Sequence, residues 1–136
     1  MDLAYDIAKF VVDIKYADLS SEAVDIGKKD ILDIFGVILA GSKHEVIRKL
    51  LSLVDVWGGI EQSSVLVYGK KYPLPGSVLV NSAMANALDY DDTHERGGTH
   101  NGCVVVPSAL AFSEFKGTVT GKEFLTTVCM GIELGC

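Results

Sequence analysis

Hydrophobic residues recur at the spacing of an α-helix over most of the chain. Near the N-terminus they share one helical face, while most of the charged residues fall elsewhere: Leu3, Ile7, Phe10, Val11 and Ile14. A second helix is predicted after the stretch DLSSEA, where Ser20 or Ser21 can cap the first turn. We expect this helix to end at Gly41, because glycine suits the left-handed position that follows a helix.

The helical pattern continues along the chain with one interruption. Apolar residues between 46 and 57 indicate a third helix, which ends at Gly58-Gly59. The stretch 63–75 instead mixes β-branched and aromatic residues with glycine and proline, which predicts a short extended or hairpin connection. Helical spacing returns from about Ser77.

Two more helices are predicted after residue 100. Pro107 is expected near the start of a helix through SALAFSEF, where its missing N–H costs little. Thr120 and Glu123 have the spacing of a capping box, and the apolar pattern after them continues to Leu134. The sequence therefore predicts an all-α fold, a bundle-like unit of several helices with a short hairpin connection near 63–75.

The composition is that of a globular protein. The 136 residues are 49% hydrophobic and 22% charged, and the net charge of -6 argues against nucleic-acid binding, which requires a basic face. The N-terminus lacks the features of a signal peptide, and the apolar run IFGVILAG is too short to span a bilayer. Cys103, Cys129 and Cys136 lack metal-ligand spacing and indicate reduced thiols. We therefore expect a cytoplasmic protein that binds neither nucleic acid nor a membrane.

The polar stretch ALDYDDTHERGGTHNG, residues 87–102, stands out in this apolar chain. A helix that continues into ANALDYDD carries carboxylates at the negative end of its dipole. Asp89 and Asp92 are three residues apart, so on a helix they also share a face and repel. Broken local rules of this kind tend to mark functional or strained sites.

Three interpretations of this stretch remain open. Asp91 or Asp92 can form an Asx-turn or cap nearby backbone amides, with the other polar residues solvated. The aspartates with His94 and His100 can ligate zinc or iron, but their spacing matches no familiar ligand pattern, so we expect no bound metal. A histidine paired with a carboxylate can also transfer protons near neutral pH, while a threonine hydroxyl donates to a substrate carboxylate.

The same region carries a resemblance to a known family. The stretch NSAMANALDYDDTHERGGTHNG, with VVVPSALAFSEF and GKEFLTTVCMGIELG after it, resembles the MmgE/PrpD family. DILDIFGVILAGS, residues 30–42, resembles an early helix of that family. The resemblance covers essentially the whole chain. It implies that residues 1–136 are part of the family's large helical domain, without the smaller α+β lid domain.

The resemblance also implies an activity and the residues that perform it. The family includes 2-methylcitrate dehydratase, cis-aconitate decarboxylase and iminodisuccinate epimerase, which act on small polycarboxylates without an organic cofactor. Its active-site aspartate, threonine and first histidine correspond here to Asp89, Thr93 and His100. Asp92 and His94 are candidates for supporting them. This sequence departs from the family in THNG, where asparagine replaces the proline that follows the histidine.

Family members are much longer, and their second histidine and substrate-binding lysines lie beyond the region matched here. We therefore expect an N-terminal fragment or split-gene piece of a lyase that dehydrates, decarboxylates or epimerises a small polycarboxylate. It is expected to act as a homo-oligomer, because the family is typically dimeric, or with a complementing C-terminal fragment. The alternative is a non-catalytic helical remnant or interaction module that binds a paralogue or partner chain.

Overall fold

The computed structural model describes residues 2–136 and confirms a mostly helical fold. Within these residues the chain forms six α-helices, one 3₁₀-helix and one two-stranded hairpin, in the order α1 (Leu3–Asp13), η1 (Tyr16–Asp18), α2 (Ser21–Gly41), α3 (Glu45–Trp57), β1 (Ser63–Val65), β2 (Lys70–Tyr72), α4 (Leu74–Asn86), α5 (Gly102–Lys116) and α6 (Gly121–Gly135). None of these helices is both long and apolar enough to cross a membrane.

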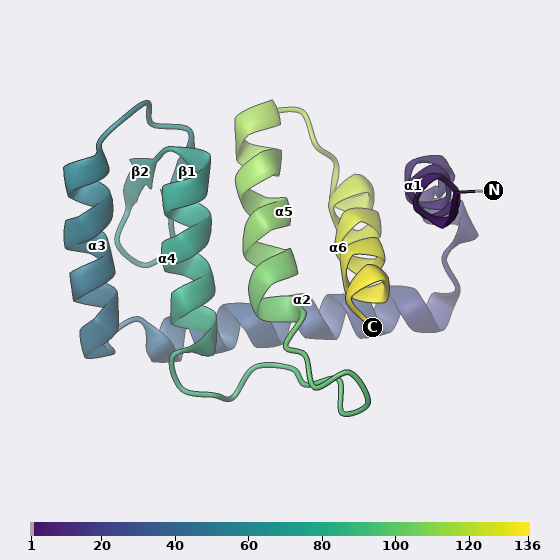
Figure 1. Ribbon diagram of the computed structural model, residues 1–136, viewed down its shortest axis with the longest axis horizontal. Coiled ribbons are helices and arrows are strands. Elements are labelled where there is room, and N and C mark those ends of the chain that lie inside the picture. Colours follow the sequence, from purple (N-terminus) through teal and green to yellow (C-terminus); the bar gives the residue numbers. More distant parts are fainter. Residues whose placement is uncertain (1) are drawn as a thin grey trace.

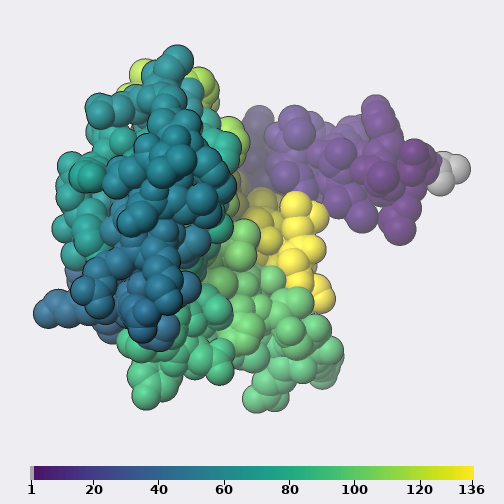
Figure 2. All heavy atoms as spheres, turned by 60° about the vertical axis from the view of Figure 1, so that its left-hand side comes forward, coloured from purple at the N-terminus to yellow at the C-terminus, as the bar shows by residue number. Residues whose placement is uncertain are grey.

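The long helix α2 forms the base of the molecule, and the later helices lie across it. In Figure 1, α3, α4, α5 and α6 stand side by side along α2 in the order of the chain. Helix α2 contacts α4, α5 and α6, and each helix of the row contacts the next. Figure 2 shows α1 projecting away from this array. No residue of α1 is buried, so the rest of the chain covers little of it.

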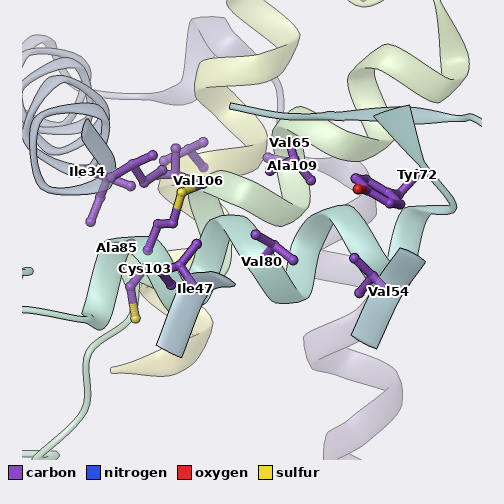
Figure 3. Close-up of a cluster of buried hydrophobic side chains, with 13 residues drawn as sticks. Ile34, Ile47, Val54, Val65, Tyr72, Val80, Ala85, Cys103, Val106 and Ala109 are labelled. Atoms are coloured by element: carbon purple, nitrogen blue, oxygen red, sulfur yellow. The ribbon is translucent and has the colours of Figure 1, made fainter. Parts of the chain in front are cut away.

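The hydrophobic core is formed by side chains of α2, α3, α4, α5, α6 and the hairpin (Figure 3). The side chains that are fully buried in it include Ile34, Ile38, Val65, Val80, Met84 and Val106. Burying one such side chain is worth roughly 1.5–3 kcal/mol. The loop between α4 and α5 extends from this core.

The strands β1 and β2 pair antiparallel, which confirms the predicted hairpin connection. Glu114 of α5 fastens this hairpin, because its carboxylate accepts hydrogen bonds from Ser63 Oγ at 2.9 Å and Ser64 Oγ at 2.8 Å. Burial raises the pKa of Glu114, but the hydrogen bonds from Ser64 and Ser63 outweigh it and hold that pKa below its usual value. The second half of α5 is thereby tied to the hairpin.

Helix ends that are set by neighbouring residues agree with the prediction. Ser20 Oγ accepts the N–H of Ala23 at the start of α2. Thr120 and Glu123 form the expected capping box at the start of α6. Gly58 ends α3 with a φ of 61°. Each of these signals lies within one turn of the boundary that it sets.

Three boundaries differ from the prediction. Gly41 is the last helical residue of α2 and not a left-handed cap; a side chain there would collide with a backbone carbonyl of α4. Helix α4 begins at Leu74, before the expected Ser77. Pro107 lies in the second turn of α5, because that helix already begins at Gly102. At Gly41 a close approach to α4 decides the boundary, whereas proline in the first turn of α4 is a local signal for its start.

Candidate active site

The polar stretch forms the connection between α4 and α5, residues 87–101. Helix α4 ends at Asn86, so the expected helix through the aspartates is wrong, and Asp89 and Asp92 share no helical face. Asp89 makes the turn instead: its φ is 57°, and its N–H donates to the Asn86 carbonyl at 3.0 Å. This left-handed conformation costs a non-glycine residue about 1 kcal/mol. The loop therefore holds Asp89 in a conformation that its backbone disfavours.

Asp91 is the buried centre of the loop, with a side chain that is 0% exposed. Asn86 Nδ2 donates to both of its carboxylate oxygens at 3.2 Å. On the other side, His100 Nδ1 lies 3.4 Å from Asp91 Oδ2. Burial, followed by the hydrogen bond and charge of Asp91, raises the pKa of Cys103 to about 12. The Cys103 thiol therefore stays protonated at neutral pH and is unsuited to act as a nucleophile.

Asp89 and His100 come together around Asp91. A carboxylate oxygen from each aspartate and an imidazole nitrogen all lie within 4.8 Å of one another. Asp89 is exposed and the His100 side chain is 33% exposed, so both can be reached from solvent. Two oxygens and one nitrogen at this spacing offer a ligand set for a divalent cation. The same groups also suit the transfer of a proton.

Asp92 supports the start of α5. Its Oδ1 accepts the N–H of Gly102 at 2.8 Å, which satisfies one of the unpaired amides of the first turn. Its charge also lies at the positive end of the helix dipole. Asp92 therefore caps an amide that lies ten residues further along the chain, on the first residue of α5. Asp30 of α2 is close enough that the charge of Asp92 contributes to a raised Asp30 pKa.

His94 and Thr93 lie in the outer part of the loop. His94 pairs with Thr99 in an isolated antiparallel bridge, with the His94 N–H donating to the Thr99 carbonyl at 2.9 Å. His94 Nδ1 accepts the N–H of Gly97 at 3.3 Å, so this imidazole stabilises the turn. Thr93 is exposed to solvent. The contacts of His94 are thus made within the turn, while Thr93 faces solvent.

Two residues of this cluster lie outside the predicted set. The sequence pattern suggested Asp91 only as a turn former and did not single out Asn86. The available signal was the position of Asp91 in the middle of the Asp-Tyr-Asp-Asp-Thr motif. Its complete burial comes from the way the loop folds back on α4 and α5, which the local pattern does not encode.

A separate apolar groove of about 760 Å³ lies between α1, α5 and α6. None of the five predicted site residues lines it. Lys116 and Lys122 line this groove and stand at the end of α5 and the start of α6. The opposite ends of these two helices adjoin the loop, where Thr99 Oγ1 donates to the Gly135 carbonyl at 3.4 Å. The two lysines are therefore far from His100.

Comparison with known proteins agrees with the resemblance read from the loop. Residues 5–136 match the sequence profile of the MmgE/PrpD N-terminal domain. The chain is also 23% identical over 134 residues to cis-aconitate decarboxylase from Aspergillus terreus, and equally to the protein of that name from one strain of this fungus. These alignments cover 96% of the chain but 27% of each relative, so the chain spans about a quarter of their length. Since the family profile covers nearly all of the chain, the protein belongs to the MmgE/PrpD family.

Proposed function

We propose that this chain is the N-terminal part of the helical domain of an MmgE/PrpD-type lyase and supplies one side of an active site for a small polycarboxylate. The observation that carries the proposal is the meeting of Asp89 and His100, the residues that the family resemblance nominates, within 4.8 Å of one another and of Asp91. An imidazole beside carboxylates, open to solvent, suits acid–base chemistry near neutral pH.

In this site His100 acts as the general acid or base, at the leaving group or at the carbon that loses a proton. Asp89 orients a catalytic group or shares a proton with it. Thr93, exposed on the same loop, donates its hydroxyl to a substrate carboxylate. Dehydration, decarboxylation and epimerisation can all pass through negative charge on a carbon beside a carboxylate, which fixed hydrogen-bond donors stabilise.

A polycarboxylate also needs positive charge, because an uncompensated anion in a closed pocket is costly. In the described part of this chain, Arg96 is the single lysine or arginine within the loop of residues 87–101. Lys116 and Lys122 lie at the far ends of α5 and α6 from that loop. The chain spans only 27% of its curated relatives. We place the remaining cations in family sequence outside this chain, either in a longer polypeptide or in a complementing partner. The free thiols of Cys103, Cys129 and Cys136 fit a reducing, cytoplasmic setting.

The proposal predicts that the chain alone turns over none of 2-methylcitrate, cis-aconitate and iminodisuccinate, and that a C-terminal fragment of the family restores activity. In the mixture, His100→Ala should lower kcat/KM by ~10²–10⁴-fold, the usual contribution of a general acid or base. Product detection with each substrate measures this. His44→Asn is the matched control, because it keeps a capping side chain at the start of α3 and should retain activity.

Two outcomes would contradict the proposal. One is turnover by the chain alone that His100→Ala leaves unchanged. The other concerns metal: Asp89, Asp91 and His100 offer three donor atoms, and the acid–base role requires the imidazole to be free to take up a proton. Elemental analysis of protein purified without chelator should therefore find no stoichiometric metal. About one tightly bound zinc or iron per chain would replace the acid–base role with a metal site.

A further inference from the structure

The environment of the Asp91 carboxylate points to a hydrogen bond that it accepts from His100. The side chain is fully buried, and a buried carboxylate is stable only when donors surround it. Asn86 Nδ2 supplies hydrogen bonds from one side at 3.2 Å. His100 Nδ1 faces Asp91 Oδ2 from another side at 3.4 Å. This separation is slightly longer than an ordinary hydrogen bond, as is frequent for catalytic pairs without substrate.

The His100 ring has a buried nitrogen that needs a hydrogen-bond partner. Its Nδ1 is buried and has no hydrogen-bond partner in the described part of the chain. Because 33% of the side chain is nevertheless exposed, the exposed surface belongs to other atoms of the ring. If Nδ1 carried no proton, its lone pair would face a buried carboxylate oxygen, which is repulsive. With a proton on Nδ1, both groups are satisfied by one small rotation.

We propose that Asp91 is the positioning residue of this site: it accepts a hydrogen bond from His100 Nδ1–H and leaves Nε2 as the nitrogen that exchanges protons with a ligand. The chemical consequence of this arrangement rests on the proposed function, whereas the hydrogen bond itself does not. Asn86 holds Asp91 in place through its amide. Asp89, which is exposed, is then free to face the ligand instead of orienting the imidazole.

This arrangement determines which nitrogen of His100 takes part in proton transfer. When His100 is neutral, Nε2 carries the lone pair, so this nitrogen can act as a base that removes a proton from the substrate. The imidazolium that forms is stabilised by the adjacent carboxylate of Asp91. Nε2–H can then return the proton to a leaving group or to the opposite face of a carbon. Asp91 itself touches neither substrate nor leaving group.

The two other histidines provide internal standards for a test. His44 Nδ1 accepts the N–H of Val46 at 3.3 Å, and His94 Nδ1 accepts the N–H of Gly97 at 3.3 Å. An acceptor nitrogen carries no proton, so both neutral rings must be protonated on Nε2. His100 is expected to be the opposite tautomer. The chain contains three histidines, so the resonances are few enough to assign by single substitution.

The test is a long-range ¹H–¹⁵N correlation spectrum of the labelled full chain at about pH 8.5, two units above the ordinary histidine pKa. We expect the Nδ1–H pattern for His100 and the Nε2–H pattern for His44 and His94. A dominant Nε2–H form of His100 in the unmodified protein would overturn the proposal, and this reading requires no variant to fold.

Two matched substitutions identify the responsible carboxylate. Asp91→Ala should shift His100 toward the Nε2–H form that free imidazole side chains prefer, whereas Asp89→Ala should leave its tautomer unchanged. The reverse result would assign the positioning role to Asp89 and overturn the proposal. The spectrum is recorded without substrate, so a failure of the proposed lyase activity leaves it unaffected. Conversely, His100 in the Nε2–H form would remove this inference and leave the family assignment and the activity assays standing.

Discussion

Asp30 is a carboxyl group of α2 whose Oδ2 is buried without a hydrogen-bond partner in the described residues. Burial is the main reason that its pKa rises to about 6, and the charges of Asp92 and Asp33 add to the effect. Asp30 in turn contributes to the raised pKa of Cys129 on α6. These neighbours are all acidic, so nothing among them compensates the ionised form.

This environment makes the contribution of Asp30 to the stability of the fold depend on pH. The unfolded carboxyl has a pKa near 3.8, so between that value and about 6 the folded protein binds more protons, and stability falls as pH rises through this window. We expect Asp30→Asn to raise Tm at pH 7.5 and to have a smaller effect at pH 4. Thermal unfolding at both values measures the difference. Asp25→Asn, on the exposed side of the same helix, should show no such pH dependence.

The predictability of the site also differs from residue to residue. The family resemblance identifies Asp89, Thr93 and His100 as site residues, and the fold brings Asp89 and His100 together. Asp91 and Asp92 are adjacent and chemically identical, yet one is the buried partner of His100 and the other caps Gly102. Which carboxylate turns inward depends on how residues 87–101 settle against α4 and α5. That choice is made by long-range contacts, and no local pattern specifies it.

At the level of elements, the caps explain which boundaries the sequence predicts. Ser20, Thr120 and Gly58 act within one turn of their own chain, so their pattern is sufficient. Gly102 begins α5 without a capping side chain from the preceding Asn101. Its amide is satisfied by Asp92, a residue from the far side of the loop. The residues next to Gly102 do not indicate this helix start, because the capping side chain comes from elsewhere in the loop.

The start of α5 therefore depends on a glycine. A Cβ added at Gly102 would lie 2.5 Å from Asp92 Oδ1 and 2.9 Å from Ile34 Cδ1. We expect Gly102→Ala to displace the Asp92 cap and destabilise the protein by about 1–3 kcal/mol, the usual cost of overpacking. Gly121→Ala is the matched control: this glycine also begins a helix, but a Cβ there meets nothing within 4 Å. Urea unfolding of both variants measures the difference. Equal stabilities would contradict the prediction, because they would show that the loop moves to accommodate the added Cβ without a cost in stability.

For the whole molecule, the helical class could be predicted but the arrangement could not. Hydrophobic residues at helical spacing identify where the helices lie along the sequence. This spacing does not say that α2 becomes the base beneath α4, α5 and α6 (Figure 1). Nor does it distinguish faces that this chain covers from those it leaves open. Leu32 of α2 and Val56 of α3 are large apolar residues that remain 73% and 83% exposed.

These open faces make association of the chain with itself the expected behaviour in solution, because isolated soluble domains rarely expose large contiguous apolar patches. The groove between α1, α5 and α6 is the apolar hollow that such contacts should use, and Phe112 lines it while 61% exposed. We expect the 14.6 kDa chain to elute from size-exclusion chromatography as a dimer or larger species.

Phe112→Lys should shift elution toward the monomer, because a charge in the groove must be desolvated for a second copy to bind. Phe115→Lys is the control: this residue is 57% exposed on the same helix but lies outside the groove, and its substitution should change elution less. A monodisperse wild-type monomer at micromolar concentration would refute the expectation, and an equal effect of the two substitutions would place the contact elsewhere on α5.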